Sequence, residues 1–178
     1  MTLEQSGTNV VATGSGTVDL AGLTLRGNSN GPPFVYPLSA ALVEGNGGAY
    51  DVYTAISEPA TFGPGVPTAA SNGTGDPLAV DGSFSQIAVP QGYLSGTPLS
   101  STATFDSTTL AALGVTPGVY TYTWGSGTDA DSLTLYAGVP AVPEPAPALL
   151  LILGAAGLAL LRYGRVIAPF RSRICGNR

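Results

Sequence analysis

Three aromatic side chains, Tyr120, Tyr122 and Trp124, occur at every second position of one short segment. Alternate residues of a β-strand point to the same face of a sheet, so the three rings would share one face. Such a row could stack against sugars as a ligand platform, or it could form half of the core of a two-sheet fold. The spacing leaves both interpretations open.

Carboxylates follow directly after this segment. Asp129 and Asp131, with Thr128 and Ser132 beside them, could supply oxygen ligands to calcium. Residues 125–130 also have the composition of a hairpin loop, in which the same carboxylates would only be solvated. No glycine-spaced repeat of Asp accompanies the pair, so we predict no metal site beyond these two calcium candidates.

Nucleophilic catalysis has few possible residues in this chain. The sequence contains no His, no Lys and a single Cys, Cys175, three residues from the end. Ser-His-Asp, Cys-His and Ser-Lys machinery is therefore absent. A pair of carboxylates, as in glycoside hydrolases, is the catalytic chemistry that remains, but no spacing singles out a pair. We expect no enzyme and no cofactor, with a carboxylate-dependent glycoside hydrolase as the weaker alternative.

The elements that must position these residues are mostly strands. Charged residues make up 10% of the chain, which has 25 Gly and 15 Pro, and this composition favours short strands joined by turns. We expect a helix of two turns over residues 107–113, and turn-rich segments at 26–49 and 57–77. Strand patterns occur at residues 9–13, 17–20, 50–55, 78–89, 101–105, 119–124 and 131–136.

The strand patterns predict an all-β fold over residues 1–138. We expect an antiparallel sandwich or a jelly-roll-like ectodomain with one short helix, followed by a single C-terminal transmembrane helix. Charge separates the two parts. Residues 1–141 have ten acids and one base, Arg26, for a net charge of −9, whereas residues 142–178 have one acid and five arginines, for a net charge of +4. An acidic body repels phosphate backbones, so we expect no nucleic-acid partner.

The tail contains an uninterrupted apolar segment behind a proline-rich spacer. The spacer covers residues 139–145 and ends in Val142, Pro143, Glu144 and Pro145. Residues 146–161 have no polar side chain, and eight of them are Leu or Ile. A helix that is apolar on every side suits lipid, and at about 1.5 Å per residue this one would make a thin membrane span.

A basic segment, residues 162–178, follows the apolar run and begins with Arg162 and Arg165. By the positive-inside rule we expect this segment in the cytoplasm, which places the body on the outer side. A buried C-terminal core helix is the alternative interpretation of the apolar run. It leaves the crowding of arginines behind that run unexplained.

The ordered combination of Val142–Pro145, the apolar run, Arg162 and Arg165 closely resembles the PEP-CTERM sorting signal. The resemblance implies an exported protein of a biofilm-forming, exopolysaccharide-producing Gram-negative bacterium. It also implies processing near the Pro-Glu-Pro motif by an exosortase, a membrane-embedded cysteine transpeptidase-like enzyme. The body also resembles an uncharacterised β-rich PEP-CTERM ectodomain, a likeness that implies no activity; the matching segments are 10–16, 89–96, 114–118 and 122–125.

The sequence therefore predicts an exported protein of the cell surface or extracellular matrix, structural or adhesive in role. We expect the helix at 146–161 to tether it to the inner membrane until an exosortase processes it. A carbohydrate-binding module for exopolysaccharide is the alternative. Residues 1–7 have neither a basic n-region nor an apolar core, so we expect the export signal to be encoded upstream of Met1.

Overall fold

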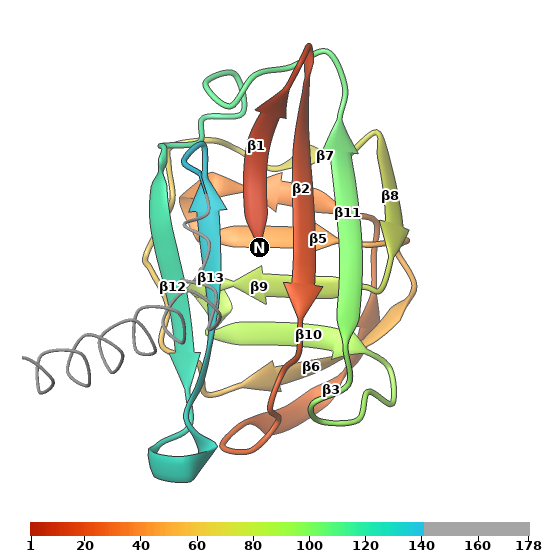
Figure 1. Cartoon of the computed structure of the whole chain (residues 1–178), viewed down its shortest axis with the longest axis vertical. Helices are drawn as coiled ribbons and strands as arrows, with labels where there is room; N and C mark the ends of the chain where they lie inside the picture. The colour runs from red at the N-terminus through yellow and green to blue at the C-terminus, as the bar shows by residue number, and fades with distance from the viewer. Residues whose placement is uncertain (141–178) are drawn as a thin grey trace, which may run out of the picture. The chain divides into compact units, whose positions relative to one another are not determined.

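Two β-sheets make up the part of the chain that the computed structural model describes, residues 1–140 (Figure 1). The first sheet has six strands in the order β12-β13-β1-β2-β11-β8. Neighbouring strands are antiparallel except β1 and β13, which run parallel. The strands are β1 (Thr2–Ser6), β2 (Asn9–Gly16), β8 (Asn72–Gly75), β11 (Leu99–Phe105), β12 (Gly118–Trp124) and β13 (Asp131–Ala137).

The second sheet has seven strands, each antiparallel to its neighbours, in the order β3-β6-β10-β9-β5-β4-β7. The strands are β3 (Thr24–Asn30), β4 (Phe34–Tyr36), β5 (Ala41–Glu44), β6 (Ala49–Thr54), β7 (Thr68–Ala69), β9 (Leu78–Asp81) and β10 (Gln86–Pro90). Short 3₁₀ helices occur at η1 (Pro37–Ser39), η2 (Gly82–Phe84) and η3 (Gly127–Asp129). The prediction of an all-β body is confirmed for residues 1–140.

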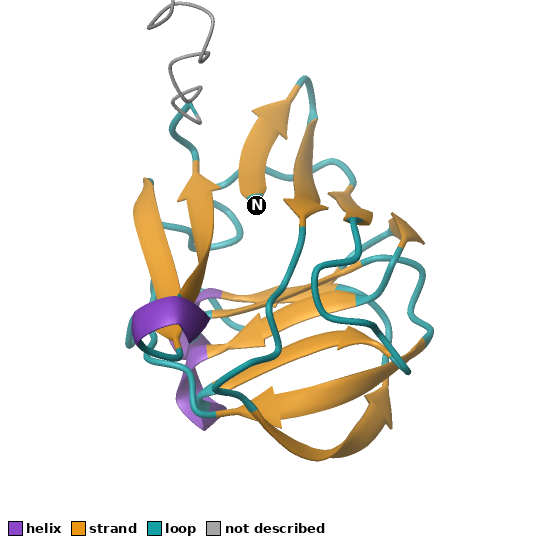
Figure 2. Ribbon diagram, turned by 60° about the horizontal axis from the view of Figure 1, so that its bottom comes forward, coloured by secondary structure: helices purple, strands orange, loops and turns teal. Residues whose placement is uncertain are grey.

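The core lies between the two sheets, whose strands cross one another in the view of Figure 1 and whose layers are seen in the turned view of Figure 2. In the first sheet, β11 buries every second residue from Leu99 to Phe105, and β13 buries every second residue from Leu133 to Ala137. This alternation follows from the two-residue period of a strand. Leu42, Val80 and Ile87 of the second sheet belong to the same buried cluster.

Strong alternation in the sequence located several elements correctly. The patterns at residues 50–55, 101–105 and 131–136 correspond to β6, β11 and β13. The loop predicted at residues 125–130 joins β12 to β13, which pair as an antiparallel hairpin.

The two-turn helix predicted at residues 107–113 is wrong, because this segment forms turns instead. Ser107 adopts a left-handed conformation with φ of 50°, which a helix cannot include. The backbone N–H of Thr108 donates to the Thr8 carbonyl, and that of Leu110 donates to the Gln5 side chain. The β1–β2 hairpin therefore binds the donors that would begin the helix.

The segments expected to be turns also contain strands. Residues 26–49 include β4, β5 and most of β3, and residues 57–77 include β7 and β8, whereas the single strand expected at 78–89 is two, β9 and β10. Glycine helps to explain β8, since a Cβ atom at Gly73 would collide with the Gly45 backbone. At this position, close approach of two backbones rather than apolar alternation accounts for the residue type.

The remaining predictions concern the tail. The motif Val142–Pro145, the apolar run 146–161, and the basic segment with Arg162 and Arg165 lie outside the described residues. Residues 1–140 include no helix long and apolar enough to span a membrane.

Candidate functional site

The three aromatic residues of β12 point toward the core. Tyr122 is 0% exposed and donates from its hydroxyl to the Ala40 carbonyl at 2.7 Å. Trp124 is 4% exposed and donates from Nε1 to the Asp19 carbonyl at 2.7 Å, while Tyr120 is half-buried. Sugar stacking requires an accessible ring face, so the platform interpretation is wrong for Tyr122 and Trp124. The burial of these rings fits the other interpretation, in which they form part of the core between the sheets.

Both calcium candidates accept hydrogen bonds from other residues of the protein. The Asp131 carboxylate accepts from the backbone N–H of Asp19 at 2.8 Å and from that of Ser132 at 2.7 Å. Asp129 accepts from the Thr128 hydroxyl at 3.1 Å. Within residues 1–140 no three His, Cys, Asp or Glu residues are grouped so that they could hold a metal ion.

A hollow lies on the outer face of the second sheet, away from the core. Val43, Ala79 and Ala88, from three adjacent strands, are buried there in a cluster separate from the main core. Phe34 and Tyr50 pack against this cluster and line the hollow, which has a volume of about 140 Å³. Apolar hollows with a few polar groups are where small ligands usually bind.

A second hollow, of about 290 Å³, extends the first toward β3. Ser29, Val52 and Gln86 line both hollows, so we treat the two as one outer groove. Arg26 and Asn28 line its β3 end, whereas Phe34 and Tyr50 line the opposite part. The β3–β6 ladder shifts register between Leu25 and Gly27, which makes Arg26 the extra residue of a β-bulge. Bulges often redirect a side chain beside a functional site.

Gln86 and Asp81 are two of the polar side chains that line the outer groove. The Nε2 atom of Gln86 is buried and has no hydrogen-bond partner among residues 1–140, and leaving a buried donor unpaired costs about 1–3 kcal/mol. Asp81 accepts from the Ser39 hydroxyl at 3.2 Å, and burial raises the pKa of its carboxyl. The groove thus combines aromatic surface with polar side chains at its lining.

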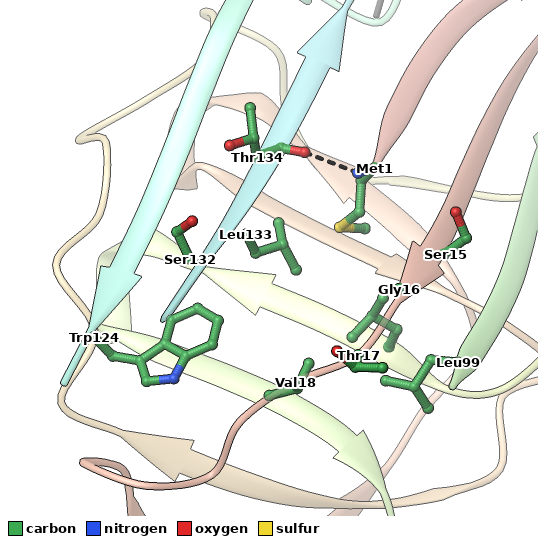
Figure 3. A pocket seen from close by; sticks show the side chains of 11 residues that line it. Met1, Ser15, Gly16, Thr17, Val18, Leu99, Trp124, Ser132, Leu133 and Thr134 are labelled. Atoms are coloured by element: carbon green, nitrogen blue, oxygen red, sulfur yellow. Dashed lines mark hydrogen bonds between the residues drawn. The ribbon is translucent and has the colours of Figure 1, made fainter. Parts of the chain in front are cut away.

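A different hollow, of about 190 Å³, lies in the first sheet beside the start of β1 (Figure 3). The β1 ladder meets β13 only through Thr2 and Leu3, so the hollow opens between β13 and β2 below Met1. Val18, Leu99, Trp124 and Leu133 are among its apolar lining residues. No titratable side chain lines it, and the titratable group among its lining residues is the Met1 ammonium, which donates to the Thr134 carbonyl at 2.8 Å and whose pKa burial lowers.

A buried carboxylate lies between the sheets. Glu44 is 0% exposed, and its Oε2 accepts from the Ser101 hydroxyl at 2.7 Å. Burial raises the pKa of Glu44 to about 7, against the lowering effects of Ser101 and the Met1 ammonium group. This carboxyl has no path to the outer groove, which is on the other face of the second sheet.

The residues of the outer groove were not recognised as a site in the sequence. In the sequence, Arg26 stands out only as the single base of the body, and Phe34 lies in a segment expected to consist of turns. One signal was available in β10, where alternate residues point to opposite faces of the sheet. Ile87 and Val89 share one face, and Gln86, Ala88 and Pro90 share the other. Comparison with known proteins found no match among protein-family models, curated proteins or solved structures.

Proposed function

We propose that this chain is an exported protein of the bacterial cell surface or extracellular matrix, with a structural or adhesive role and no enzymatic activity. The order of motif, apolar run and arginines in residues 142–178 carries the proposal. The tail would hold the protein in the inner membrane until an exosortase processes it. The two-layer body fits a sandwich or jelly-roll-like ectodomain presented outside the cell.

Cell fractionation in an exosortase-producing host tests this proposal. The protein should leave the inner membrane in the parent strain and accumulate there when the exosortase gene is deleted. Replacing Pro143 and Glu144 with Ala should reproduce the deletion, whereas replacing Thr128 with Ala, in the body, should not. Equal distribution of the protein in both strains would refute the sorting role.

Carbohydrate binding is a second candidate function, favoured by the outer groove. Phe34 and Tyr50 offer ring surface for the apolar faces of sugars, and Ser29 and Gln86 add polar side chains beside them. Aromatic rings with polar neighbours provide contact area and orientation together. The ligand would be the exopolysaccharide of the producing cell.

Retention on immobilised exopolysaccharide tests this second candidate. Tyr50→Ala should weaken retention without unfolding the protein, because Tyr50 is only half-buried. Phe84→Ala is the matched control, since Phe84 is 63% exposed and does not line the groove. Equal retention of the two variants would exclude the groove as the binding site.

A further inference from the structure

Arg26 is the only basic side chain in residues 1–140. A single cation among ten acids could occupy any surface position, yet a β-bulge places this one beside the outer groove. A carboxylate across the β3–β6 ladder has its hydrogen-bond partner elsewhere. Asp51, opposite Asn28 in the ladder, accepts from the backbone N–H of Gly92 at 2.9 Å.

The neighbours of Arg26 in the groove are hydrogen-bonding groups without charge. Asn28, Ser29 and Gln86 line the same hollow. An arginine fork binds a carboxylate through two parallel hydrogen bonds. One end of the groove can therefore bind a carboxylate and its adjoining hydroxyls, while Phe34 and Tyr50 at the other part can stack on the next sugars.

The charge of the body restricts which acidic polymer would fit. Residues 1–141 have a net charge of −9, so a polymer with a carboxylate on every sugar would be repelled over distances up to the Debye length, about 8 Å in physiological salt. A polymer with carboxylates spaced several sugars apart would present one to Arg26 and neutral sugars to the rest.

We propose that the outer groove binds an exopolysaccharide with isolated uronic acid residues. Arg26 pairs with the carboxylate of the uronic acid, and Phe34 and Tyr50 contact the neutral sugars beside it. This proposal rests on the carbohydrate-binding candidate above and narrows it to one ligand class. It makes Arg26 the residue that distinguishes acidic from neutral polymers.

The test compares three polysaccharides against the full-length chain kept in mild detergent. The probes are gellan, which has sparse glucuronate, the same gellan with its carboxyl groups reduced, and polygalacturonate, which is charged at every sugar. Gellan should bind most tightly. Arg26→Gln should lower its affinity by at least about tenfold, since hydrogen bonds to charged groups are the stronger ones. Arg26→Lys should fall between the two, because it keeps the charge and loses the fork.

The outcomes separate this proposal from the function on which it rests. If reduced gellan binds as tightly as gellan, or if Arg26→Gln leaves gellan binding unchanged, the role of Arg26 is refuted and carbohydrate binding stands. Tighter binding of polygalacturonate than of gellan would refute the preference for sparse charge. If no polysaccharide binds, including that of the host, both proposals fail. Unfolding curves for the variants should match the parent, since Arg26 is exposed.

Discussion

The Ser101 hydroxyl donates a 2.7 Å hydrogen bond to the Glu44 carboxylate between the two sheets. Ser101 belongs to β11 of the first sheet and Glu44 to β5 of the second, so this bond joins the two inner faces. The other carboxylate oxygen, Oε1, is buried without a partner among residues 1–140. Burial disfavours the charged form of Glu44, which is why its pKa rises to about 7 even though Ser101 donates to it.

We expect the free energy of unfolding to fall as the pH rises through the range from 4.5 to about 7. The pKa of Glu44 is higher in the folded chain than its usual value of 4.5, so the folded state binds more protons between these limits and loses stability as the proton leaves. The full effect is roughly 3 kcal/mol. Urea unfolding on either side of the range, near pH 4.5 and pH 8, measures it.

The variant Glu44→Gln is the control for this pH dependence. Its amide oxygen can still accept from Ser101, but it cannot ionise, so stability should fall much less than in the parent across the same pH range. The fall that remains includes the effect of Asp81, whose pKa burial also raises. A variant that loses stability with rising pH as steeply as the parent would assign the effect to another group.

Close packing around the same carboxylate gives a second prediction. A Cβ atom at Gly14 would collide with Oε2 of Glu44 and with the Ser101 hydroxyl. We expect Gly14→Ala to lower the free energy of unfolding by about 1–3 kcal/mol, the usual cost of overpacking. Gly31→Ala is the matched control, because the atom nearest its added Cβ is the Tyr50 hydroxyl at 3.5 Å. Similar unfolding midpoints for both variants would contradict the packing described here.

The burial of Trp124 gives a third prediction. Trp124→Ala should cost about 3–5 kcal/mol of stability, as expected for a large buried ring, and it also leaves the Asp19 carbonyl without its donor. Phe84→Ala, at a residue that is 63% exposed, should change stability by less than about 0.5 kcal/mol. Denaturant unfolding of the two variants checks the difference. A Trp124→Ala protein as stable as the parent would contradict the burial of this ring in the core.

The parts of the fold that the sequence predicts are those in which one strand face is apolar and the other is polar. Leu133 and Leu135 alternate with Ser132 and Thr134, and the matching strand β12 lies one short loop away. Pairing of this kind is local, so the pattern and the turn specify it together. The all-β class and the β12–β13 hairpin were predictable for this reason.

The remaining strands depend on contacts between distant segments. Thr74 pairs with Thr102, and their hydroxyls lie 2.8 Å apart, yet nothing local in the Gly- and Asn-rich β8 marks it as a strand. The helix expected at 107–113 failed for the same reason, because Thr8 and Gln5 bind its first donors from across the molecule. Local propensity cannot anticipate such partners.

The outer groove could not be recognised from the hydrophobicity pattern, because β10 is apolar on both faces. In β10, Ile87 and Val89 point into the core while Ala88 lies on the outer face, so hydrophobicity does not reveal which face is which. Gln86 is the polar clue on the outer face. Arg26 was visible as the only base of the body, but its position beside Gln86 depends on the bulge in β3, which is a feature of the folded sheet.

The central claim is that the tail is a sorting signal, and the mass of the mature protein tests it most directly. Intact mass spectrometry of the protein from its exosortase-producing host should show a C-terminus near Glu144 or Pro145, with the apolar run and the arginines removed. In the exosortase deletion strain, the protein should keep every residue to Arg178. A mature protein that ends at Arg178 in both strains would contradict the account.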